Sequence, residues 1–91
     1  MTPPGDSSQP RLAAGCRWGT NPNEPAVLFP EGMIRLEGTG QKILELCDGQ
    51  RTFAEIISAL TARYMLADQK RIREDVSKFL EELNSKRIID Y

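Results

Sequence analysis

The 91-residue chain has no histidine, and its two cysteines, Cys16 and Cys47, lie far apart. The absence of histidine removes the side chain that most often serves as a general base or as a transition-metal ligand. Two cysteines at this separation form neither a zinc-binding motif nor a disulfide framework. An unassisted enzyme is therefore disfavoured, and we expect no catalytic residues, no bound metal and no cofactor.

Long apolar runs and a surplus of charge of one sign are also missing. No run approaches the roughly 18 apolar residues of a membrane helix, and the first residues lack the features of a secretory signal. We therefore expect a cytoplasmic protein that does not enter a membrane. Lys and Arg number 12 and Asp and Glu 13, so bulk charge does not favour nucleic acid as a partner. With 40% apolar residues, the chain is typical of one small globular domain.

The first ten residues differ in composition from the rest. Residues 1–10 contain three prolines, two serines and one glycine, and they offer almost nothing to bury. This predicts a mobile N-terminal Pro/Ser-rich arm before a single domain at residues 11–91. A neighbouring subunit could hold the arm in place, which leaves a homodimer open.

Three short strands are expected after the arm. Residues 11–18 form a weak candidate, Ala26–Phe29 suit a second strand, and Met33–Leu36 suit a third. The tight turn Pro30–Gly32 would join the last two as a hairpin, whereas residues 19–25 are a loop that is dense in turn formers. Strands this short leave one or two exposed sheet edges.

Beyond the third strand, the apolar period changes from two to 3.6 and predicts three helices. The first opens at Thr39, and the second opens with a capping box formed by Thr52 and Glu55. Asp68 is expected to cap the third helix, which runs to about residue 86. The resulting fold class is mainly α with a small N-terminal antiparallel β-sheet (α+β), in the order β-β-β-α-α-α. The apolar pair at residues 88–89 is expected only to close the fold.

A basic group at the start of the third helix raises the alternative of a winged-helix DNA-binding regulator. Residues 69–87 carry six positive and four negative side chains, a net charge of +2. A surplus this small supplies little of the phosphate-driven affinity that a DNA-binding protein needs. A mixed-charge, solvated helix is therefore the favoured interpretation.

The expected arrangement also offers a surface for peptide binding. An exposed strand edge carries unpaired N–H and C=O groups that can take up an extended peptide, and an adjacent amphipathic helix can supply side-chain contacts. The alternative is that the edge is covered by the arm or by a second copy of the chain. The residues alone leave both open.

Several segments resemble a known family. The chain carries LFPEGMIRL at residues 28–36, ILELCDG at 43–49 and RTFAEI at 51–56. Together with shorter stretches, these segments resemble the PqqD family, in the same order, over about residues 10–90. The resemblance implies a winged helix-turn-helix-like fold and a peptide chaperone of pyrroloquinoline quinone (PQQ) biosynthesis. Such a chaperone is a recognition element for ribosomally synthesized and post-translationally modified peptides (a RiPP recognition element) and has no enzyme activity.

The resemblance also implies partners. The precursor peptide PqqA would add as a strand to the third strand and lie against the third helix. The domain would then present PqqA to the radical S-adenosylmethionine enzyme PqqE, which carries the iron–sulfur clusters and the S-adenosylmethionine itself.

The site can be carried onto this sequence residue by residue. The expected peptide-binding residues are Met33, Ile34, Arg35 and Leu36 on the strand and Arg73, Val76, Ser77 and Leu80 on the helix. Phe79 and Leu83 are expected in the core. Arg87 stands where the family often has glycine after the last helix, which disfavours a left-handed residue at that end.

Overall fold

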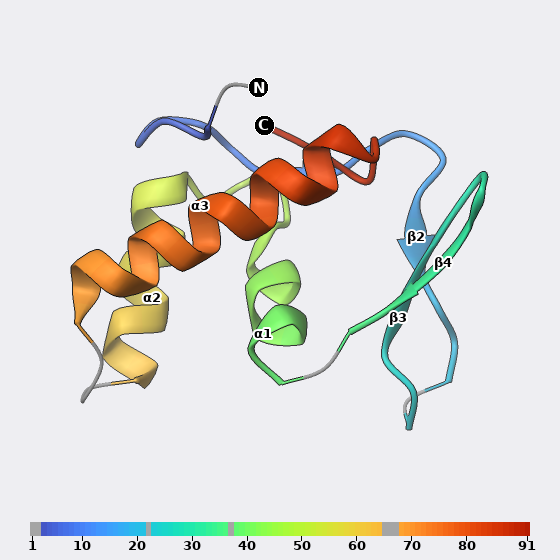
Figure 1. Cartoon of the computed structure of the whole chain (residues 1–91), viewed down its shortest axis with the longest axis horizontal. Coiled ribbons are helices and arrows are strands. Elements are labelled where there is room, and N and C mark those ends of the chain that lie inside the picture. The colour runs from blue at the N-terminus through green and yellow to red at the C-terminus, as the bar shows by residue number, and fades with distance from the viewer. Residues whose placement is uncertain (1–2, 22, 37, 65–67) are drawn as a thin grey trace.

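The computed structural model describes residues 3–21, 23–36, 38–64 and 68–91. Its elements are β1 (Arg11–Leu12), β2 (Arg17–Trp18), β3 (Ala26–Phe29), β4 (Gly32–Arg35), α1 (Thr39–Leu46), α2 (Phe53–Arg63), α3 (Gln69–Ser85) and β5 (Ile89–Asp90). In Figure 1, α1 stands between the sheet and α2, and α3 crosses α2 and continues above α1. The predicted α+β class is confirmed. None of the described helices is long and apolar enough to cross a membrane.

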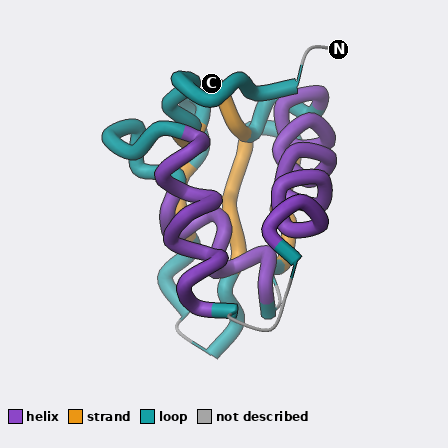
Figure 2. The backbone as a smooth tube through the Cα atoms, turned by 90° about the vertical axis from the view of Figure 1, so that its left-hand side faces the viewer, coloured by secondary structure: helices purple, strands orange, loops and turns teal. Residues whose placement is uncertain are grey.

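The strands form two antiparallel sheets. β2, β3 and β4 pair in that order, and β1 pairs with β5 near the chain's end. The expected single strand at residues 11–18 is therefore wrong in one respect, because it is split into β1 and β2. The chain turns between them at Gly15, whose φ of 86° suits glycine, and the Cys16 N–H donates to the Ala13 carbonyl at 3.0 Å. Figure 2 shows the helices in front of the strands when the molecule is viewed from the side.

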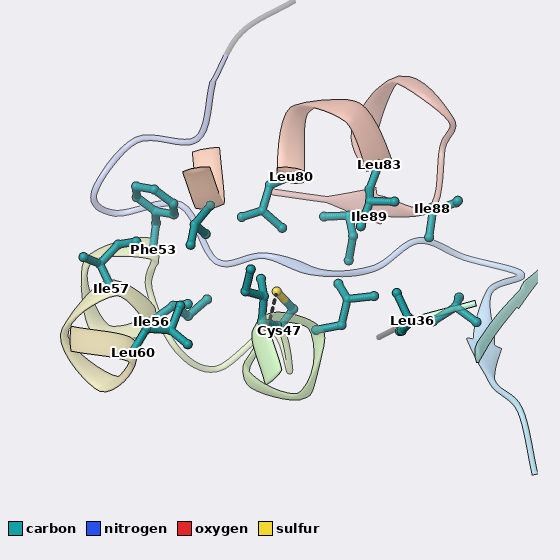
Figure 3. Packing of buried hydrophobic residues seen from close by; sticks show 14 residues of the cluster. Leu36, Cys47, Phe53, Ile56, Ile57, Leu60, Leu80, Leu83, Ile88 and Ile89 are labelled. Atoms are coloured by element: carbon teal, nitrogen blue, oxygen red, sulfur yellow. Dashed lines mark hydrogen bonds between the residues drawn. The ribbon is translucent and has the colours of Figure 1, made fainter. Parts of the chain in front are cut away.

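One cluster of apolar side chains joins the sheet, the three helices and β5. Its members are Val27, Leu36, Ile43, Leu44, Cys47, Phe53, Ile56, Ile57, Leu60, Val76, Leu80, Leu83, Ile88 and Ile89. Figure 3 shows this cluster, in which Leu83, Ile88 and Ile89 gather below the end of α3. Burying one such aliphatic side chain stabilises the fold by about 1.5–3 kcal/mol. Ile88 and Ile89 thus do more than close the chain, since both are fully buried and Ile89 pairs with Leu12.

Helix starts follow the predicted local chemistry. The Glu55 N–H donates to Thr52 Oγ1 at 3.2 Å, and the Thr52 N–H donates to Glu55 Oε1 at 2.9 Å, which confirms the capping box of α2. The Lys70 N–H donates to Asp68 Oδ1 at 3.0 Å at the start of α3. Both caps satisfy donors that a helix cannot pair internally.

The N-terminal segment is held by its own chain, contrary to the expectation of a mobile arm. The Phe53 N–H donates to the Ser8 carbonyl at 2.7 Å, and the Ala54 N–H donates to the Asp6 carbonyl at 3.2 Å. These are first-turn donors of α2, which have no partner within the helix. The Asp6 carboxylate also forms an ion pair with Arg73 of α3, and Pro4 is buried. Residues 3–10 therefore cover the start of α2 and one side of α3.

The end of α3 differs from the expectation for Arg87. Its φ is 60°, so Arg87 itself adopts the left-handed conformation. The Ile88 N–H donates to the Leu83 carbonyl at 2.9 Å, and the Arg87 N–H donates to the Asn84 carbonyl at 3.0 Å, the pattern of a Schellman motif. These bonds and the burial of Ile88 offset the strain that arginine bears in this conformation.

We expect Arg87→Gly to raise the free energy of unfolding by about 1 kcal/mol, because glycine adopts a positive φ without the steric cost of a Cβ. Chemical denaturation followed by circular dichroism measures the change. Arg87→Ala is the control, since alanine removes the charge but keeps the Cβ, and it should give no such gain. A gain of the same size in both variants would contradict the assignment to backbone strain.

Two exposed carboxylates link the stability of the fold to pH. Hydrogen bonds from the Gln50 and Arg51 N–H groups lower the pKa of Asp48, and the hydrogen bond from the Thr52 N–H lowers the pKa of Glu55. A carboxyl group whose pKa is lower in the folded state stabilises the fold above its unfolded pKa, and this contribution is lost as the pH falls.

We therefore expect the melting temperature to fall as the pH is lowered from about 6 to about 3. The double variant Asp48→Asn, Glu55→Gln should be less stable than the wild type near neutral pH, and its melting temperature should depend less on pH across this window. Calorimetric melting curves measure both effects. Parallel pH profiles for the two proteins would show that these carboxylates do not carry the dependence.

Candidate functional site

β4 forms an edge of the three-stranded sheet. Among the described strands it pairs only with β3, with Val27 opposite Ile34 and Leu28 opposite Met33. The backbone groups on the other side of β4 therefore have no partner strand in the described part of the chain. Such an edge is the usual acceptor for an additional strand.

Two hydrogen bonds fix which backbone groups of β4 point to this edge. The Gly19 N–H donates to the Ala26 carbonyl at 2.8 Å, so Ala26 faces β2, and the Leu36 N–H donates to the Pro25 carbonyl at 2.8 Å. In an antiparallel sheet, neighbouring residues of a strand bond to opposite sides. Counting back from Leu36, Ile34 bonds to β3.

The same alternation leaves Met33 and Arg35 with their N–H and C=O groups directed at the open edge. Their side chains also share one face, and both are exposed, Met33 to 56%. The intervening Ile34 is half-buried and packs against the core, and Leu36 is buried. The four expected strand residues thus divide into two that face the core and two that present an open backbone.

The first turn of α1, the helix that follows β4 in the chain, lies next to α3. A Cβ at Gly40, in the first turn of α1, would lie 3.4 Å from Cζ of Phe79. Glycine thus lets the Phe79 ring lie against the start of α1. Phe79 was expected in the core, but it is half-buried and packs against the margin of the apolar cluster. Phe79 therefore packs α3 against the start of α1.

The helix residues expected to line a peptide cleft lie elsewhere on α3. Val76 and Leu80 are 2% and 0% exposed and belong to the core. Arg73 and Ser77 lie on the side of α3 beside the N-terminal segment, where they line a hollow of about 470 Å³ together with Pro3 and Pro4. The Arg73 guanidinium also sits 5.2 Å from the centre of the Phe53 ring. Val76 and Leu80 thus share the apolar cluster with Leu36, whereas Arg73 and Ser77 lie beside the N-terminal segment.

Sequence reasoning missed the contact between Gly40 and Phe79. The hydrophobic stripe of α3 includes Phe79 together with Val76 and Leu80, so periodicity alone assigns all three to the interior. A glycine inside the first turn of a helix was the available signal, because glycine in a helix often marks a close approach.

The two thiols are not activated for nucleophilic chemistry. Burial raises the pKa of Cys47 to about 12, and its S–H donates to the Ile43 carbonyl at 3.2 Å (Figure 3). Burial also raises the pKa of Cys16. A thiol needs a lowered pKa to be reactive near neutral pH. Within the described ranges, no three His, Cys, Asp or Glu side chains gather to hold a metal ion.

Comparisons with known proteins point to one family. The sequence model of the family described as "Coenzyme PQQ synthesis protein D (PqqD)" matches residues 24–89. A "PqqA binding protein" of Pseudomonas aeruginosa (strain UCBPP-PA14) is 37% identical over 83 residues, which cover 89% of this chain and 88% of the relative. A protein of the same description from Methylococcus capsulatus is 40% identical over 65 residues, which cover 71% of this chain and 67% of the relative.

Two solved structures are similar in fold. The PqqD truncation of Methylobacterium extorquens PqqCD, described as a functional and stand-alone RiPP recognition element, is 30% identical with a TM-score of 0.76, covering 96% of this chain and 94% of that chain. TbiB1 in complex with the TbiA(beta) leader peptide is 22% identical with a TM-score of 0.78, covering 88% and 94%, and shows likeness of fold. The family match, the curated relatives and the shared fold show that this chain belongs to the PqqD family of coenzyme PQQ synthesis proteins.

Proposed function

We propose that this chain binds the precursor peptide PqqA as an added strand on β4 and presents it, in the cytoplasm, to the radical S-adenosylmethionine enzyme PqqE. Curated relatives are named PqqA binding proteins, and the Methylobacterium extorquens relative is described as a RiPP recognition element. Both descriptions support a role in peptide recognition without catalysis by this chain.

The observation that carries the proposal is the pair of open backbone positions on β4. Met33 and Arg35 offer two N–H donors and two C=O acceptors, spaced as the next strand of an antiparallel sheet requires. Main-chain hydrogen bonds of this kind give affinity, and side chains on the two faces of the sheet give selectivity. An added strand would keep its own far edge open, which leaves the peptide accessible to a second protein.

For the helix side of the site, we add one residue to those first expected. Phe79 is our first candidate, because its ring lies half-buried against Gly40 at the start of α1. Peptide contacts with Arg73, Val76, Ser77 and Leu80 stay a prediction. A homodimer also stays a prediction, and pairing between two β4 edges would compete with the peptide for the same backbone groups.

Hydrogen exchange measured by NMR distinguishes the two sides of β4. In the free protein, the amides of Met33 and Arg35 should exchange quickly, and that of Ile34 should exchange slowly because it bonds to β3. Saturation with synthetic PqqA should slow Met33 and Arg35 by at least about tenfold and change Ile34 less. Unchanged exchange at Met33 and Arg35 in the saturated complex would exclude strand addition at this edge.

Replacing Arg35 by proline removes one edge-facing donor and places a ring where the guest strand would lie. The native sheet should tolerate this change, because the Arg35 N–H does not bond to β3. We expect Arg35→Pro to weaken PqqA binding by at least about tenfold in calorimetry, with an unchanged circular dichroism spectrum.

The matched control is Arg35→Ala, which loses the same side chain but keeps the N–H donor. It should bind PqqA clearly more tightly than Arg35→Pro. Equal affinity of the two variants would show that the backbone group at this position does not contact the peptide.

A further inference from the structure

The outer face of the sheet ends at β4 in one apolar and one basic side chain. Arg17, Leu28 and Met33 lie opposite one another across the three strands, so they form a row that ends at the open edge. Arg35 lies two residues beyond Met33 on the same face. A strand added to β4 would place one side chain opposite Met33 and another, two residues away, opposite Arg35.

The guanidinium of Arg35 is available to a new partner. Within the described part of the chain, it forms an ion pair with Glu24, at 3.8 Å, and the two side chains are 65% and 58% exposed. Exposed pairs of this kind contribute little, because water screens them and both side chains lose freedom.

Cross-strand geometry puts one guest side chain within reach of Arg35 and another within reach of Met33. Directly opposite residues of antiparallel strands have Cβ atoms about 4.5–5.5 Å apart, and opposite charges at such positions attract each other. A carboxylate opposite Arg35 would compete with Glu24, which must reach Arg35 from the loop before β3. An apolar side chain opposite Met33 would cover a thioether that is otherwise mostly in water.

We propose that Arg35 selects an acidic side chain of the bound peptide and that Met33 selects an apolar side chain two residues away from it. The residue between them faces the inner side, next to Ile34, and is apolar. This inference rests on the proposed strand addition, because only an added strand fixes the spacing of two. It makes Arg35 and Met33 specificity-determining residues of the edge, in addition to their backbone role.

Charge reversal on both partners tests the proposal. Calorimetry would compare the wild type and Arg35→Glu against synthetic PqqA and against PqqA peptides in which each Asp or Glu is replaced in turn by Lys. Arg35→Glu should bind unmodified PqqA about fivefold more weakly or worse. One substituted peptide should bind Arg35→Glu more tightly than unmodified PqqA does, and the same peptide should bind the wild type more weakly.

Arg17→Glu is the matched control, because it makes the same charge change on the same face but at the opposite edge of the sheet. It should change the affinity less than Arg35→Glu and should not rescue any single peptide. Equal losses for both variants, or no rescued peptide, would overturn the role of Arg35. If Arg35→Glu loses its folded circular dichroism spectrum, Arg35→Gln replaces it. At the PqqA position where Lys weakens binding to the wild type, Arg35→Gln should bind the acidic and the Lys peptide with equal affinity.

Hydrogen exchange separates this inference from the proposed function. Slowed exchange at the amides of Met33 and Arg35 without any rescued peptide would keep strand addition and reject acid selection. Fast exchange at both amides in the saturated wild-type complex would reject strand addition and this inference together.

Replacing Met33 by Asp tests the apolar half of the inference by calorimetry. Binding of PqqA should weaken by about fivefold or more if an apolar guest side chain covers Met33, and unchanged affinity would reject that half of the inference.

Discussion

Because backbone groups point alternately to the two sides of a β-strand, a central strand can satisfy two neighbours and an edge strand only one. β3 is the central strand here: Ala26 bonds toward β2, and Val27 bonds toward β4. This alternation decides which positions of β4 are left open, and it does so without any unusual side chain. The proposed activity of the molecule thus follows from the number and order of its strands.

The rest of the chain holds this edge in place through burial. Val27 and Leu36 anchor the hairpin in the apolar cluster, which also contains side chains of the three helices and of β5. Residues 11–12 pair with residues 89–90, so segments close to the two ends of the chain are joined by backbone hydrogen bonds. The helices therefore enclose the core, while β4 lies at its margin and, among the described strands, pairs on one side only.

The features that sequence predicted well are local ones. The capping box at Thr52 and Glu55 and the cap at Asp68 depend on side chains within a few residues, so the pattern itself contains the interaction. The hairpin of β3 and β4 follows from two apolar runs and a tight turn in the same way. The edge strand of the candidate site could be predicted from the sequence for this reason.

The features that sequence missed depend on contacts between distant segments. The N-terminal segment is ordered because the carbonyls of Asp6 and Ser8 accept hydrogen bonds from the start of α2. No local pattern in a Pro-rich stretch predicts these bonds. Periodicity shows that α3 has an apolar stripe, but its rotation relative to β4 is set by packing, which turns Arg73 toward the N-terminal segment. Arg87 is accepted in a costly conformation for the same kind of reason, since Ile88 must reach the core.

The region that identifies the family is smaller than the region that forms the fold. The family match begins at residue 24, after β1, β2 and the segment that caps α2. A fragment trimmed to that border would lose the partner of β5 and would also strip β2 from the sheet. β3 would then become a second unpaired rim, so the shortened protein would offer a guest two acceptor strands instead of one and would invite sticking between copies.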